Sequence, residues 1–117
     1  MIKETIKYKD FNGNDQEETC YFHMTKTEGT LLELSVPGGW SKKMEKHIAD
    51  NDISSLGVMW HDLILDSYGE KTEDGKRFIK SAEIRENFKR SAAFDAIFIE
   101  LLTDEAKAKA FSEGLLR

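Results

Sequence analysis

The residues best suited to chemistry lie in SYGEKTEDGKRFIKS, residues 67–81, where two glycines stand among acidic and basic side chains. A phosphate-binding loop needs the pattern G-x-x-x-x-G-K-[ST] directly after a strand, so that backbone N–H groups surround the phosphates. Here Gly69 and Gly75 are six residues apart, Arg77 follows Lys76, and the preceding segment has the pattern of a helix. The sequence therefore predicts no nucleotide-binding loop and no cofactor.

Histidine and cysteine, the other residues suited to catalysis or metal binding, are few. His23, His47 and His61 form no H-x-x-x-H or H-E-x-x-H pattern, and a closed metal site needs three or four ligands. Cys20 is the single cysteine, so no disulfide can form within the chain. Its alternation with Phe22 predicts a small core residue rather than a nucleophile. We expect no metal site, no catalytic residues and no enzymatic activity.

The charge distribution argues against nucleic acid as a partner. The 117 residues carry a net charge of −5, whereas phosphate binding favours clustered lysine and arginine. Residues 70–90 hold seven basic side chains but also five acidic ones, which favours a solvated face. The N-terminus, MIKETIKYKDF, has no apolar signal core, and no run approaches the roughly 18 apolar residues of a membrane span. These features predict a cytoplasmic protein without membrane or nucleic-acid partners.

The first 24 residues predict an antiparallel β-hairpin. Apolar residues alternate with lysines over residues 2–10, which is the pattern of a half-buried strand. Asn12-Gly13 is typical of a two-residue type I′ turn, which needs positive φ at both positions. Residues 17–24 alternate again and predict the return strand. Such a hairpin is marginal alone, so we expect it to lean on helices.

The remaining chain predicts five or six short helices. We expect them after the capping box from Thr25 to Glu28, at 42–50 after Ser41, at 54–68, at 82–90 after Ser81, from Ser91 through Leu102, and at about 104–113. The whole is an α+β fold that forms a single domain over residues 1–117, with a hairpin (1–24) and a helical part (25–117).

Local details of these helices can be predicted as well. Gly69 suits a left-handed C-cap of the third helix, and Asp74-Gly75 suits a reversal within a connector at residues 70–80. We expect Ile48 to face inward with Met44. In the last helix we expect Ala106, Ala110 and Phe111 to share one side and Gly114 to end the helix.

Five residues are candidates for binding another protein. Trp40 lies outside any apolar stripe after a Pro-Gly-Gly turn, and Tyr68 ends a helix beside the charged connector. Aromatic side chains of this kind commonly anchor interfaces. Lys71, Arg77 and Phe78 of the connector complete the predicted protein-binding set.

Two segments around the connector, ILDSYGEK (residues 64–71) and DGKRFIKS (residues 74–81), resemble the tail assembly chaperones of long-tailed bacteriophages. The resemblance covers nearly the whole chain. IKYKDFNGNDQEET (residues 6–19) is similar to the N-terminal hairpin of that family, and SAAFDAIFIELLTDEAKAKAF (residues 91–111) to its closing helices. It implies a non-enzymatic chaperone that binds the tape measure protein, keeps its apolar helices soluble and recruits the major tail (tube) protein.

The resemblance also implies action in the host cell cytoplasm and departure before the virion is complete. A homo-oligomer is possible, because an uncovered apolar helix face favours rings or filaments. A second class of function is a small acidic regulatory protein or inhibitor that acts by binding a protein, for example as a DNA mimic. Mimicry requires carboxylates along one face, whereas this sequence mixes both signs throughout. An enzyme would instead require a cleft with two or more perturbed titratable groups.

Overall fold

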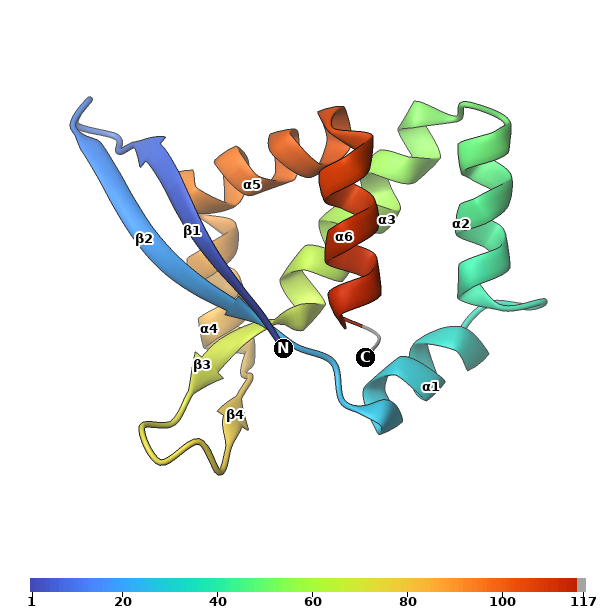
Figure 1. The fold of residues 1–117 in the computed structure, drawn as a ribbon, viewed down its shortest axis with the longest axis horizontal. Coiled ribbons are helices and arrows are strands. Elements are labelled where there is room, and N and C mark those ends of the chain that lie inside the picture. The colour runs from blue at the N-terminus through green and yellow to red at the C-terminus, as the bar shows by residue number, and fades with distance from the viewer. Residues whose placement is uncertain (116–117) are drawn as a thin grey trace.

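The computed structural model describes residues 1–115 and confirms the expected α+β class, with an N-terminal antiparallel hairpin followed by helices. Within these residues a second, short hairpin interrupts the helices (Figure 1). The elements in chain order are β1 (Ile2–Lys9), β2 (Asp15–Phe22), α1 (Lys26–Leu34), α2 (Trp40–Ala49), α3 (Ile53–Ser67), β3 (Tyr68–Lys71), β4 (Phe78–Ile79), α4 (Ala82–Lys89), α5 (Ala92–Thr103) and α6 (Glu105–Leu115).

The strands form one antiparallel sheet in the order β1-β2-β3-β4. β1 and β2 pair along their full length, from Ile2 opposite Phe22 to Lys9 opposite Asp15. The contact between β2 and β3 is much shorter, because only Tyr21 and Phe22 have partners there. The short hairpin of β3 and β4 is therefore attached to one end of the long hairpin.

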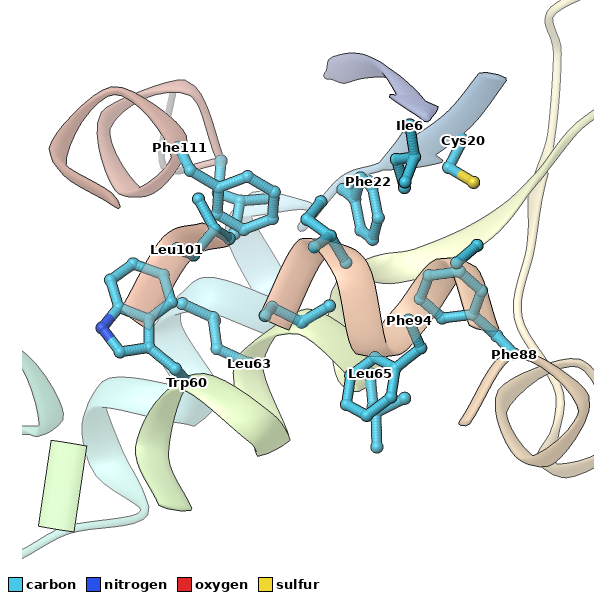
Figure 2. Packing of buried hydrophobic residues seen from close by; sticks show 14 of the residues in the cluster. Ile6, Cys20, Phe22, Trp60, Leu63, Leu65, Phe88, Phe94, Leu101 and Phe111 are labelled. Atoms are coloured by element: carbon cyan, nitrogen blue, oxygen red, sulfur yellow. The ribbon is translucent and has the colours of Figure 1, made fainter. Parts of the chain in front are cut away.

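Side-chain alternation in the long hairpin separates a core face from a solvent face, as predicted. Ile6, Cys20 and Phe22 are buried, and Figure 2 shows them pointing from the hairpin toward the helices. Lys3, Lys7 and Lys9 are exposed on the other face. Burial raises the pKa of the Cys20 thiol to about 12, so the group stays protonated at neutral pH. Cys20 is a small core residue, as expected.

The tip of the long hairpin differs from the predicted two-residue turn. Residues 10–14 form the loop, and only Gly13 has positive φ there (82°), whereas a type I′ turn needs it at Asn12 too. The Asp10 carboxylate replaces that turn. It accepts hydrogen bonds from the backbone N–H groups of Asn12 and Asn14, both 2.9 Å, and from Gln16 Nε2 at 2.8 Å. These bonds, led by the one from Gln16, lower the pKa of Asp10.

An aromatic cluster joins the hairpin to the helices. The Phe22 ring is completely buried and meets Phe88 and Phe111 edge to face, with ring centroids 5.9 Å and 5.3 Å apart. Trp60 on α3 contacts Phe111 in the same geometry, at 6.1 Å. Each fully buried aromatic side chain contributes roughly 1.5–3 kcal/mol, and each such pair about 0.5–1.5 kcal/mol more. These rings join β2, α3, α4 and α6 into one core (Figure 2).

Most helix starts follow the predicted caps. Thr25 and Glu28 form the capping box of α1, while the hydroxyls of Ser81 and Ser91 accept from the N–H groups of Ile84 and Phe94. The expected cap at Ser41 is wrong. Gly39, with φ of 98°, precedes α2, which begins at Trp40, so Ser41 lies inside the first turn. Glu33 of α1 accepts from the backbone N–H of Ser41 at 2.8 Å and from its hydroxyl.

Gly69 is not a left-handed helix cap. Gly69 does not have positive φ. It lies in β3, because the backbone is already extended at Tyr68 (φ −67°, ψ 140°). Its hydrogen side chain is needed for a different reason. A Cβ at Gly69 would lie 2.6 Å from Phe78 Cε2 and 2.8 Å from the carbonyl oxygen of Ile79. The glycine therefore allows the paired strand β4 and the Phe78 ring to approach β3 closely.

Three further expectations fail because packing overrides the local pattern. The Ile48 side chain is 51% exposed, although Met44 is buried as expected. Ala106 and Ala110 are exposed, so Phe111 is the only one of that trio in the core. Gly114 does not end α6, which continues to Leu115, and a Cβ at Gly114 would lie 3.0 Å from Ile2 Cγ1.

The close contact at Gly69 gives a first test. We expect Gly69→Ala to lower the free energy of unfolding by about 1–3 kcal/mol, because the backbone carbonyl of Ile79 cannot move aside as a flexible side chain could. Gly57→Ala is the matched control, since that glycine lies inside α3 with open space around it. The control should raise stability by about 0.5–1 kcal/mol. Equal urea midpoints for Gly69→Ala and the natural protein would contradict this account.

Candidate partner-binding surface

The short hairpin brings together four of the five residues predicted to bind a protein. Tyr68 begins β3 and Lys71 ends it, Arg77 precedes β4, and Phe78 begins β4 directly opposite Lys71. The fifth residue, Trp40, begins α2 and is half-buried against the core. Figure 1 shows α2 and the short hairpin on opposite sides of the molecule. Trp40 therefore lies apart from the short hairpin.

Strand alternation places Phe78 and Lys71 on the face of the sheet that points away from the core. We call this the outer sheet face and define it as Tyr21, His23, Lys71, Phe78 and Lys80. Lys71 Nζ lies 5.9 Å from the centroid of the Tyr21 ring, and Lys80 Nζ lies 5.9 Å from that of Phe78. The rings of His23 and Phe78 meet edge to face at 5.9 Å. The surface thus combines half-buried aromatic rings with ammonium groups above them.

Tyr68 belongs to the opposite face of the same strand. Its ring stacks on Phe88 with centroids 3.8 Å apart and planes within 2°, and it meets Phe22 edge to face at 5.7 Å. Burial raises the pKa of the Tyr68 hydroxyl to about 12. Tyr68 therefore helps to hold the short hairpin against the core.

The loop between β3 and β4 is a structured hairpin turn. Thr72 N–H donates to the carbonyl oxygen of Arg77 at 2.9 Å, and the N–H of Gly75 donates to the carbonyl of Thr72 at 2.9 Å. Gly75 has φ of 73°, in agreement with the predicted reversal at Asp74-Gly75. The Asp74 carboxylate accepts from the N–H of Lys76 and from the Thr72 hydroxyl, and these bonds lower its pKa. The polar groups of the turn thus bind one another.

His23 is a member of the outer sheet face that the sequence did not single out. Its Nδ1 is shielded from solvent and has no hydrogen-bond partner. Burial lowers the pKa of His23, the nearby N-terminal amine and Lys80 lower it further, and Glu28 opposes them. His23 alternates with Tyr21 along the strand, and this parity was the one signal available in the sequence.

α1 borders the outer sheet face and carries exposed leucines. None of its nine residues is buried, and its leucines Leu31 and Leu34 are 62% and 76% exposed. Polar contacts hold it in place. Glu28 pairs with Lys80 of the outer sheet face at 2.7 Å, and Glu33 binds Ser41 of α2. α1 is therefore held against the molecule by polar side chains and by Leu32, while Leu31 and Leu34 stay exposed.

Over residues 1–115 no three His, Cys, Asp or Glu side chains gather closely enough to hold a metal ion. Nor does any helix there combine the length and apolarity required to cross a membrane.

Removing the Glu28 carboxylate tests how α1 is anchored. Burial disfavours its ionisation, but bonds from Lys80 and from the N–H of Thr25 outweigh this and lower its pKa. Its contribution to stability is therefore present above pH about 4.3, the ordinary glutamate pKa, and is lost as the pH falls through the lowered folded value. We expect Glu28→Ala to cost about 1 kcal/mol at pH 7 and to lower hydrogen-exchange protection mainly in α1.

Glu45→Ala provides the control, because Glu45 is exposed on α2 and makes no ion pair within the described residues. It should leave urea unfolding unchanged at both pH 7 and pH 3. A Glu28→Ala deficit as large at pH 3 as at pH 7 would show that the carboxylate charge does not anchor α1.

A family model described as phage tail assembly chaperone matches residues 1–116. No curated protein and no solved structure matches the chain.

Proposed function

Because the chain belongs to the phage tail assembly chaperones, we propose that it binds the tape measure protein during tail morphogenesis. In this proposal it keeps the tape measure protein soluble and helps to recruit tail tube subunits. It acts in the host cell cytoplasm and leaves before the virion is complete. In this proposal the protein acts by binding and releasing its partner, which accords with the non-enzymatic role that the family indicates.

The exposed leucines of α1 are the observation that best supports this proposal. An amphipathic helix binds a partner by packing apolar side chains at positions i, i+3 and i+4, and Leu31 and Leu34 have that spacing. Leu32, one position along, packs toward the core and leaves those two outward. The tape measure protein is proposed to be a long helical polypeptide with exposed apolar side chains before the tail tube surrounds it. Those side chains would pack against Leu31 and Leu34.

Modest affinity at each contact suits such a chaperone. Burying both leucines in a complex would contribute roughly 3 kcal/mol, far short of what a tight complex needs. Many copies along one long partner would still coat it, and each copy could be displaced singly when tube subunits arrive.

The remaining predicted residues extend this surface in two directions. Trp40 lies just beyond the turn that follows α1, so we place it at one edge of the proposed contact. Lys71, Arg77 and Phe78 lie toward the other edge, across the Glu28–Lys80 pair. The cationic groups of Lys71 and Arg77 suit carboxylates on the polar face of a bound helix, and the ring of Phe78 adds an apolar contact.

The leucines can be tested by co-expression with helical fragments of the tape measure protein. We expect Leu31→Ser combined with Leu34→Ser to lower the recovered soluble complex at least about tenfold, because the lost apolar contact exceeds 1.4 kcal/mol. The melting temperature should change little, since both side chains are already exposed. Ile99→Ser is the control, as Ile99 is 49% exposed on α5. Unchanged recovery of the double variant would refute the role of α1.

The charged edge is tested by reversing Lys71 and Arg77 together to glutamate. We expect fragment binding to weaken about tenfold at low salt and the loss to shrink at high salt, because these groups are exposed and screened. Lys42→Glu with Lys43→Glu makes the same change of charge on α2. If both pairs weaken binding equally, only net charge matters and the short hairpin has no specific contact.

A further inference from the structure

A groove of about 620 Å³ lies where the tip of the long hairpin approaches the junction of α4 and α5. Tyr8, Lys9 and Phe11 line it from the hairpin side, and Lys89, Arg90 and Phe94 from the helices. None of these residues belongs to α1 or to the outer sheet face.

The groove is cationic on a protein whose net charge is −5. Lys9, Lys89 and Arg90 line it together with a single acid, Asp95. Lys9 and Arg90 also make ion pairs, with Asp15 at 3.0 Å and Glu86 at 2.9 Å. Exposed pairs of this kind are worth about 0–1 kcal/mol, so either cation can turn toward a ligand. Lys89 pairs with no acid among residues 1–115.

Phe11 supplies an apolar contact at the same place. Its side chain is 84% exposed, so it contributes almost nothing to the core. Its loop is nevertheless tightly built, because the Asp10 carboxylate accepts three hydrogen bonds from within residues 10–16. Because the loop is already fixed, little conformational entropy is lost when a ligand packs on Phe11 beside the cationic groove.

We propose that this groove binds an acidic peptide segment of a partner protein that carries an apolar side chain next to its carboxylates. The carboxylates pair with Lys89, Arg90 and Lys9, while the apolar side chain packs on Phe11 and the wall behind it. A nucleic-acid backbone fits less well. Phosphate binding favours many clustered cations, whereas this groove has three cations, one acid and an apolar wall. This second surface leaves α1 free, so one molecule can hold two partner segments at once.

The experiment is a titration of the isotope-labelled protein, followed by amide NMR, with a short peptide in which glutamates flank one phenylalanine. A counterpart with glutamine at every glutamate position, and an oligothymidylate, serve as the other probes. We expect saturable shifts at the hairpin tip and the α4–α5 junction, and binding of the glutamine peptide and the oligonucleotide at least about tenfold weaker.

Two variants and one control decide the outcome. Phe11→Ala should weaken the glutamate peptide about tenfold without changing the melting temperature, because the ring is exposed. Lys89→Glu with Arg90→Glu should abolish binding, whereas Lys42→Glu should not affect it. The Leu31→Ser and Leu34→Ser protein should bind this peptide normally, which separates the groove from the proposed tape measure contact.

Several results would overturn the proposal. These are an absence of shifts, shifts centred on other surfaces, equal binding of the glutamine peptide, preferential binding of the oligonucleotide, and retention of binding by Phe11→Ala or the charge-reversed protein.

Discussion

The packing of Phe22 against rings from three later elements is the contact on which the rest of the structure depends. The long hairpin has few apolar residues of its own, and its outward face is charged. Phe22, the last residue of β2, packs this end of the long hairpin against α4 and α6 and, through Tyr68, against the start of β3. The short hairpin and the outer sheet face take their positions from this anchor, while β1 also packs on α5, which borders the groove at the tip.

Sequence reasoning succeeded where the determining interactions are local. Alternation over a few residues specified the long hairpin and the burial of Cys20, and side-chain caps within three residues specified the starts of α1, α4 and α5. It failed where a distant residue decides. Gly69 resembles a helix cap in sequence, but its role is set by the close approach of Phe78 and Ile79. Ser41 resembles a cap, but Glu33 from the preceding helix takes up its N–H.

The candidate surface was predictable only in part for the same reason. Lys71, Arg77 and Phe78 were found by their position in a charged connector, and pairing of β3 with β4 brings them together. Pairing with a strand nearly fifty residues earlier adds Tyr21 and His23, which no local pattern could reveal. The leucines of α1 look like core residues in sequence. They point outward because Leu32 packs on the core while Glu28 and Glu33 bind Lys80 and Ser41, contacts that the helix pattern does not encode.

The contact between the first strand and the last helix has a consequence for how the chain folds during synthesis. Ile2 lies against Gly114 so closely that a methyl group there would touch it, and β1 also packs on α5. A ribosome releases the N-terminal hairpin long before these helices emerge, and contacts of such large sequence separation form slowly. The apolar face of the nascent hairpin therefore cannot be fully covered until Phe111 has left the ribosome and can pack on Phe22.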